Sequence, residues 1–136
     1  MTVANFIRYA ESGRYNGTVI HRSVPDFVVQ GGWLTYESES NSLIPIKTDS
    51  ALSNEFRLSN IRGTVAMAKV GGDPNSATSQ WFINLSDNSK NLDNQNGGFA
   101  VFGRVIGNGI TVADEISSMK TYTVGGITDF PLKDYV

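Results

Sequence analysis

The chain has 136 residues, of which 40% are hydrophobic and 18% charged, and its formal net charge is −2. A chain of this length and composition can bury a sizeable core. It is therefore predicted to form a single folded domain over residues 1–136, and a disordered chain is excluded. The low net charge gives no indication of a nucleic-acid partner, and no apolar run is long enough for a membrane span. The absence of cysteine excludes disulfides and thiolate chemistry.

A short amphipathic helix is expected at the start of the chain. Thr2 is its expected N-cap, apolar residues recur at helical spacing from Val3 to Ala10, and Gly13 ends it. The pair Asn16-Gly17 then suits a tight turn. Fourteen glycines and few helical patterns predict a β-rich fold for the rest.

Residues 20–33 predict two strands joined by a tight turn at Val24-Pro25-Asp26. Alternation along the second strand puts Val28 and Gln30 on one face. A hairpin would bring Arg22 opposite either Gln30 or Val28. From this spacing alone, Arg22 is as readily a structural arginine as a functional one.

Residues 35–53 are polar and serine-rich, so we expect a long surface loop, held in place by the apolar residues 43–46. Residues 54–63 are also expected to be irregular. Within them, Phe56, Leu58 and Ile61 are expected to dock inward.

Three further strands and a second helix are expected beyond residue 63. The strands are 64–69, 80–85 and 99–106, the loops are 71–76 and 86–98, and the helix covers 111–119. Thr111 begins a capping-box pattern at the start of that helix. Residues 122–136 are expected to be irregular. Asp87 and Asp93 lack the spacing of a calcium-binding loop, so neither a metal nor a cofactor is expected.

Four blocks of the sequence, taken together, resemble the cyclophilins, a family of peptidyl-prolyl cis-trans isomerases. The first block, His21 to Gly32, reads HRSVPDFVVQGG, and the others are 63–69, 76–84 and 99–105. They occur in the family's order and look closest to bacterial members. The resemblance implies a mainly β fold, a closed antiparallel barrel of eight strands capped by two helices.

The chain departs from the family pattern at both ends. Cyclophilins open with two strands before the first helix and close with a strand that returns to the barrel. Here those strands are expected to be missing, which would leave open sheet edges. The chain is then either a trimmed version of a longer protein or a barrel whose missing edge another chain supplies.

The resemblance also implies the residues of an active site. Arg22 would donate a hydrogen bond to the imide nitrogen of the substrate, and Gln30 would orient Arg22 and contact the substrate backbone. The proline pocket would consist of Phe27, Val28, Phe82, Leu92 and Phe99. The peptide before the proline would be held by Ala68, Lys69 and Gln80.

Several of these positions differ from the best-known eukaryotic pattern. Val28 stands where methionine is common, Phe99 replaces a histidine, and Lys69 replaces an asparagine. Asn91 falls near the place of a tryptophan that helps to hold the drug cyclosporin, so we expect weak or no cyclosporin binding. His21, the only histidine, is interpreted as structural rather than as a catalytic base.

The leading hypothesis is an isomerase of X–Pro bonds in proline-containing peptides and unfolded proteins, acting as a monomer. Alternatives are a module that binds proline-containing segments without turnover, and a fragment that does not fold stably. The compartment stays open: the bacterial resemblance favours a periplasmic or secreted protein over a cytoplasmic one.

Overall fold

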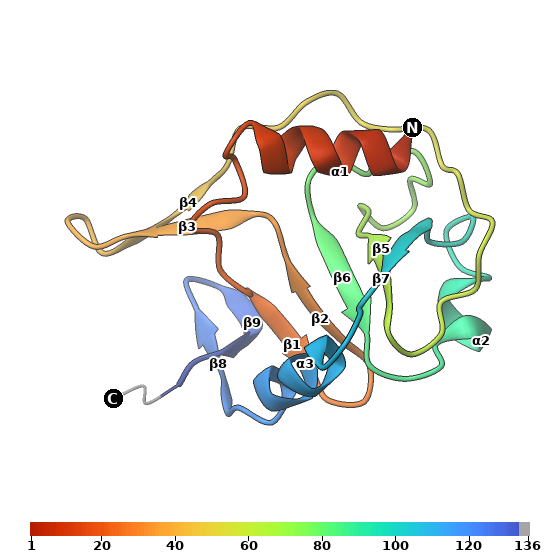
Figure 1. Cartoon of the computed structure of the whole chain (residues 1–136). Coiled ribbons are helices and arrows are strands. Elements are labelled where there is room, and N and C mark those ends of the chain that lie inside the picture. Colours follow the sequence, from red (N-terminus) through yellow and green to blue (C-terminus); the bar gives the residue numbers. More distant parts are fainter. Residues whose placement is uncertain (134–136) are drawn as a thin grey trace.

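A five-stranded antiparallel sheet with the strand order β1-β2-β6-β5-β7 forms the middle of the computed structural model, which describes residues 1–133 (Figure 1). Two further strand pairs, β3-β4 and β8-β9, stand beside it. The strands are β1 Arg22–Val24, β2 Val28–Gly31, β3 Leu34–Glu37, β4 Ser42–Pro45, β5 Thr64–Met67, β6 Trp81–Asn84, β7 Val101–Arg104, β8 Thr121–Val124 and β9 Ile127–Pro131. The helices are α1 Thr2–Glu11, α2 Ser89–Leu92 and α3 Gly109–Ser117.

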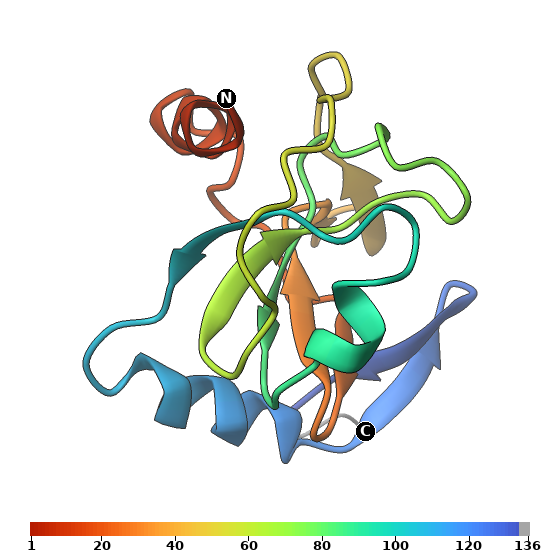
Figure 2. The same ribbon diagram turned by 90° about the vertical axis from the view of Figure 1, so that its right-hand side faces the viewer.

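Helices α1 and α3 lie at opposite ends of the five-stranded sheet in both views of the ribbon (Figures 1 and 2). The mainly β architecture expected from the sequence is therefore confirmed, with one short helix, α2, added to the two that were expected. None of the helices in residues 1–133 has the length and hydrophobicity needed to cross a lipid bilayer.

The hairpin β1-β2 has one of the two registers that the sequence allowed. Arg22 pairs with Gln30, and Val24 pairs with Val28. The turn between the strands contains Asp26 at φ 61°, a left-handed conformation that aspartate tolerates better than most residues. On its other side, β2 pairs with β6, which places Phe82 opposite Gln30. Phe82, from a distant part of the chain, thus lies across adjacent strands from the hairpin residues Arg22 and Gln30.

The two faces of β2 belong to two different apolar clusters. Val28, 2% exposed, packs with Ala66, Phe82 and Leu92 on one face. Val29, fully buried, packs with Leu85 and Ala113 on the other face, under α3. This is the alternation that a pleated strand imposes, and here both faces are covered.

The prediction of a long loop over residues 35–53 is wrong for residues 35–45, whereas residues 46–53 contain no helix or strand. The strands β3 and β4 pair there in register, Thr35 with Ile44 and Tyr36 with Leu43. Serines are frequent in residues 35–53 and therefore indicated a loop. Paired strands can nevertheless carry serine on an exposed face. In Figure 1 this hairpin reaches away from the rest of the molecule.

The prediction of irregular structure over residues 122–136 is also wrong, as far as residue 133. The strands β8 and β9 form a hairpin whose turn is Gly125-Gly126, with both φ angles positive. A Gly-Gly pair between β-branched residues is a recognised signal for such a turn. Residues 134–136 lie outside the described part of the chain.

Four smaller expectations also fail. The N-cap of α1 is Met1, because Thr2 instead binds Glu55 through its backbone N–H and its hydroxyl group. Helix α3 begins at Gly109, two residues before the expected capping box, which does not form. Leu58 and Ile61 are 61% and 49% exposed and do not dock inward. Within the expected loop 86–98, residues 89–92 form α2.

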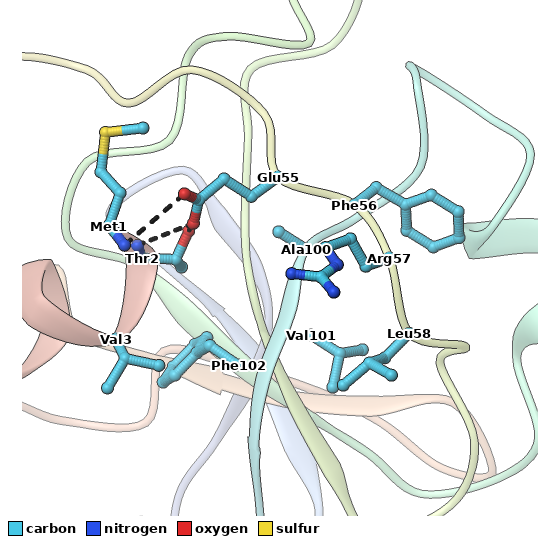
Figure 3. Close-up of a pocket in the computed structure, with 10 residues that line it drawn as sticks. All are labelled: Met1, Thr2, Val3, Glu55, Phe56, Arg57, Leu58, Ala100, Val101 and Phe102. Carbon is cyan, nitrogen blue, oxygen red and sulfur yellow. Dashed lines mark hydrogen bonds and ion pairs between the residues drawn. The ribbon is translucent and has the colours of Figure 1, made fainter.

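The sheet does not close into a barrel within residues 1–133. Its edge strands are β1 and β7, and β9 lies alongside β1 without joining its ladder. The edge at β7 adjoins a groove between the start of α1 and residues 55–58, as the close-up shows (Figure 3). The fold of residues 1–133 is therefore mainly β with helices. Its two edge strands, β1 and β7, have no further strand hydrogen-bonded to them in the described residues.

A set of buried amide side chains, which we call the asparagine network, ties β6 to the segments around it. It consists of the buried side chains of Asn60, Asn84 and Asn88 together with the partly buried carboxylate of Asp93. The amide nitrogen of Asn84 donates to Oδ1 of Asn60 at 3.0 Å and to the hydroxyl of Thr64 at 2.9 Å, and its oxygen accepts from Asn88 at 2.8 Å. Asn60 and Asn84 are fully buried, so water cannot supply a substitute if one of these hydrogen bonds is lost.

Asp93 receives two hydrogen bonds from Asn60, one from the side chain and one from the backbone N–H, both at 2.9 Å. Partial burial raises the pKa of Asp93, but hydrogen bonds from Asn60 and Ser59 together lower it further than burial raises it. The pKa of Asp93 is therefore below its ordinary value, and the network contains a carboxylate at neutral pH.

We predict that Asn84→Ala lowers the free energy of unfolding by about 2–4 kcal/mol, because it leaves buried polar groups of Asn60 and Asn88 without partners. Urea denaturation monitored by circular dichroism measures this. The matched control is Asn16→Ala, at an exposed asparagine, which should change stability by less than about 0.5 kcal/mol. Equal stability of the two variants would contradict the role of the network.

Candidate active site

A cavity of about 520 Å³ opens on the face of the sheet that carries Val28. Nine of the ten site residues expected from the sequence line it, and the tenth, Gln80, lies behind Gln30. The lining residues are Arg22, Phe27, Val28, Gln30, Ala68, Lys69, Phe82, Asn91, Leu92, Gln95 and Phe99. Residues from four separate stretches of the sequence therefore meet around one cavity.

The floor of the cavity is apolar and rigid. Val28, Phe82 and Leu92 are each at most 4% exposed. Phe99 stands edge-to-face against Phe82, with the ring centroids 5.8 Å apart and an interplanar angle of 74°. This floor offers a water-poor surface of the size and shape that a small apolar ring can occupy.

Two of the floor residues, Leu92 and Phe99, come from a stretch with little regular structure and depend on hydrogen bonds for their position. The backbone N–H of Leu92 donates to Asn88 at 2.8 Å, and that of Phe99 donates to the carbonyl of Leu92 at 3.0 Å. The side chain of Asn60 donates to the carbonyl of Phe99 at 3.0 Å. The asparagine network thus holds one wall of the cavity.

Arg22 lies at the mouth of the cavity and is half-buried. Its Nη1 donates to Oε1 of Gln30 at 3.4 Å, and its guanidinium carbon lies 5.8 Å from the ring centroid of Phe27. No carboxylate in residues 1–133 pairs with it. A guanidinium has five donors, so most of them stay available for a ligand.

Gln30 and Gln80 continue this polar contact toward the interior. Nε2 of Gln30 donates to Oε1 of Gln80 at 2.8 Å. Because each amide has one donor end and one acceptor end, this bond fixes which end of Gln30 faces Arg22. Gln80 does not reach the cavity, so its place is behind the arginine.

His21 is 4% exposed and stands at the inner end of this contact. Its ring meets Trp33 edge-on at 5.2 Å and shares a hydrogen bond with Gln80. Burial lowers the pKa of His21 to about 4, and the nearby charge of Arg22 lowers it slightly more, whereas the bond to Gln80 opposes them. A neutral histidine outside the cavity fits the structural interpretation.

The side chain of Lys69 is anchored at the opposite wall from β1. Its Nζ donates to the carbonyls of Asn96 and Gly98, both at 2.6 Å, and lies 4.4 Å from the centroid of the Phe99 ring. Burial lowers the pKa of Lys69, and the charge of Asp73 partly offsets this. The sequence did not indicate these contacts, because they join residues 27 and 29 positions apart.

Asn91 and Gln95 form a polar rim that was not among the expected site residues. They are four residues apart, and Gln95 donates to the side-chain oxygen of Asn91. The spacing of one helical turn is the signal that was available. It was missed because residues 86–98 were expected to be loop.

A second cavity, of about 570 Å³, lies beside the start of α1 and β7 and is a poor candidate for catalysis (Figure 3). Its lining is mostly apolar. Its carboxylate, Glu55, is already bound by Thr2 and by the N-terminal amine, 3.5 Å away. Within residues 1–133 no group of three or more acidic, histidine or cysteine side chains is arranged to bind a metal.

We predict that the NMR signals of the His21 ring titrate with a midpoint of about pH 4 in the folded protein. An unfolded histidine titrates near 6.5, so the unfolded state binds more protons as the pH falls through this window. The free energy of unfolding should therefore decrease from about pH 6.5 to about pH 4, and His21→Gln should flatten that decrease. A midpoint near 6.5 would contradict the buried, neutral ring.

Comparison with known proteins gives a consistent result. A family model described as "Cyclophilin type peptidyl-prolyl cis-trans isomerase/CLD" matches residues 1–136. Peptidyl-prolyl cis-trans isomerase A of Dickeya dadantii is 41% identical over 138 residues, covering 100% of this chain and 70% of that protein. Peptidyl-prolyl cis-trans isomerase cyp18 of Streptomyces antibioticus is 43% identical, covering 99% of this chain and 81% of that protein.

A solved structure supports the same fold. The cyclophilin-type peptidyl-prolyl cis-trans isomerase of Cryptosporidium parvum, crystallised in the presence of the dipeptide Ala-Pro, aligns with a TM-score of 0.67. The alignment covers 96% of this chain and 77% of the other at 24% identity, so it shows the fold alone. The family match and the bacterial relatives confirm the resemblance drawn from the sequence, and the chain belongs to the cyclophilin-type peptidyl-prolyl cis-trans isomerases.

Proposed function

We propose that the chain isomerises X–Pro bonds in the cavity by stabilising the twisted imide with Arg22. One observation carries this proposal: a guanidinium that has no carboxylate partner among the described residues stands beside an apolar, buried floor. The reaction needs no nucleophile, metal or proton transfer. Its barrier of roughly 18–20 kcal/mol is the loss of conjugation as the C–N bond rotates.

The floor of the cavity is proposed to hold the proline ring. Val28, Phe82, Leu92 and Phe99 would enclose the ring, and Phe27 would close the side next to Arg22. Removing water from the amide disfavours the charge-separated planar form, in which the carbonyl oxygen is well hydrated. The twisted form loses less hydration free energy than the planar form when water is removed. The pocket therefore lowers the barrier to rotation as well as binding the substrate.

Arg22 is proposed to donate to the imide nitrogen when its lone pair localises in the twisted state. This bond is weak in the planar substrate, so it raises turnover more than affinity. Gln30 would hold the guanidinium and contact the substrate backbone, and Gln80 would keep Gln30 in its orientation. Reaching about 10³ turnovers per second requires lowering the barrier by about 7 kcal/mol.

The peptide before the proline is proposed to run along Ala68 and Lys69. The backbone N–H of Ala68 already donates to the carbonyl of Gln80 at 2.9 Å, so this residue is held in place by the sheet. Lys69 follows the end of β5, and its backbone groups have no hydrogen-bond partner within residues 1–133. Those groups are the ones that a bound peptide would use.

A module that binds proline-containing segments without turnover is the alternative. The Ala-Pro dipeptide named with the Cryptosporidium structure fits binding and catalysis equally. The uncommitted donors of Arg22 favour catalysis, because proline binding alone needs only the apolar floor. We further propose that the chain acts as a single domain and as a monomer on unfolded or flexible clients, with no nucleic-acid or membrane partner.

The closed eight-stranded barrel is also proposed here. Strands that pair with the open edges at β7 and β1 would continue the ladder, and the groove beside β7 leaves room for one of them (Figure 3). Whether such strands belong to the same polypeptide or to another chain, they would remove both exposed edges. The cavity lies on β1, β2, β5 and β6 and does not use the groove.

We predict that Arg22→Ala lowers kcat/KM by about 10²–10³-fold while the protein stays folded, as for the removal of other transition-state donors. Two-dimensional exchange NMR on a short Ala-Pro peptide measures the cis-trans rate directly. Arg57→Ala is the control, because Arg57 is exposed and lies outside the cavity. Unchanged exchange in folded Arg22→Ala would refute the mechanism, and peptide shifts without exchange in the unsubstituted protein would identify a binding module.

We predict weak cyclosporin binding, with a dissociation constant above about 1 μM, because Asn91 supplies no indole at the rim of the cavity. Isothermal titration calorimetry measures the constant. Asn91→Trp is the matched variant and should tighten binding. Submicromolar binding by the unsubstituted protein would show that the drug does not need that contact.

A further inference from the structure

The titratable residues that line the cavity are both cations. They are Arg22 and Lys69, and no carboxylate among residues 1–133 lines the cavity, although the chain as a whole carries a net charge of −2. We propose that the site prefers substrates with a carboxylate next to the proline, specifically Glu or Asp at the position before it. This inference rests on the proposed isomerase function and defines the substrate class of the same site.

The charge of Lys69 is held in a fixed place. Its ammonium has three donors, and two of them are committed to the carbonyls of Asn96 and Gly98. The third has no protein partner within residues 1–133, and the amine packs over the ring of Phe99. An anchored lysine loses little further side-chain entropy when it binds an anion, unlike a lysine that extends freely into water.

Neither cation is neutralised by the protein. No ion pair in residues 1–133 includes Arg22 or Lys69. Asp73 acts on Lys69 electrostatically, but it is exposed on the loop 71–76 and does not line the cavity. Two positive charges beside an apolar floor, where water screens them poorly, leave a local potential that an anionic substrate group would relieve.

The position before the proline follows from the two walls of the cavity. If the proline ring sits on the floor and the imide nitrogen meets Arg22, the preceding residue leads toward Ala68 and Lys69. A side-chain carboxylate at that position can reach the third donor of Lys69. Arg22 is then left for the imide, so the two cations have separate tasks.

A purely structural role of Lys69 is the competing explanation. In that case its two bonds only hold residues 96–98 and the ring of Phe99 in place. Removing the lysine would then slow all substrates by the same factor. A charge preference instead changes the ratio between substrates, so the ratio separates the two explanations even if the variant is less active.

The experiment compares peptides of the form Ala-X-Pro-Ala, with X as Glu, Gln or Lys, by exchange NMR at low ionic strength. We expect kcat/KM for the Glu peptide to exceed that for the isosteric Gln peptide by about 3–10-fold, and the Lys peptide to be slowest. At 0.5 M NaCl the Glu/Gln ratio should fall toward one, because salt screens exposed charge pairs.

Three variants assign the preference to Lys69. Lys69→Gln should bring the Glu/Gln ratio close to one, and Lys69→Arg should retain a ratio above one. Lys47→Gln removes the same charge from an exposed lysine outside the cavity and should leave the ratio unchanged. A Glu/Gln ratio that survives in Lys69→Gln would overturn the assignment.

The failures of the two proposals are distinguishable. If the unsubstituted protein exchanges all three peptides at equal rates, the charge preference is wrong and the isomerase function stands. If it catalyses the cis-trans exchange of none of them, both the proposed function and the charge preference are wrong.

Discussion

Buried amide groups must find partners inside the protein, and this constraint organises one side of the molecule. Asn84 satisfies it from β6 by binding Asn60 and Asn88, and Asn88 also donates to the carbonyl of Phe27 at 2.9 Å. The turn of the β1-β2 hairpin, the start of α2 and the segment before β5 are thereby joined at one point. A wall of the cavity that has little regular structure acquires a defined position from these directed bonds.

The two faces of strand β2 have different roles, one in the stability of the core and one in the site. Its Val29 side belongs to the core under α3, whereas its Val28 side forms the floor of the cavity. Gln30 lies on the same side as Val28, so the polar group that holds Arg22 and the apolar surface for the ring come from one strand, two residues apart. An element buried on both faces moves little, which suits a reaction that depends on placing one hydrogen-bond donor accurately.

Much of the site was predictable because its residues lie in short stretches with a strong local pattern. The turn at Pro25-Asp26 determines how β1 returns on β2, and the resemblance in that stretch identified Arg22 and Gln30. The anchoring of Lys69 was not predictable, because it depends on how residues 86–98 fold back toward the end of β5. The rim residue Gln95 was missed although its helical spacing from Asn91 was visible, because that stretch was expected to be a loop. At the hairpin β3-β4 the frequent serines indicated a loop, although the two strands pair in register.

The hairpin β3-β4 projects from the left of the molecule in Figure 1, whereas α2, which carries the cavity residues Asn91 and Leu92, lies toward the right. Its base is joined to the body by a few backbone contacts, among them the bond from Val19 to Leu34 and the isolated bridge between Thr18 and Thr35. An exposed tip so far from the chemistry tolerates changes of length and composition. Residues 38–41 are therefore a natural place to insert a peptide label or a tether, leaving the isomerase site undisturbed.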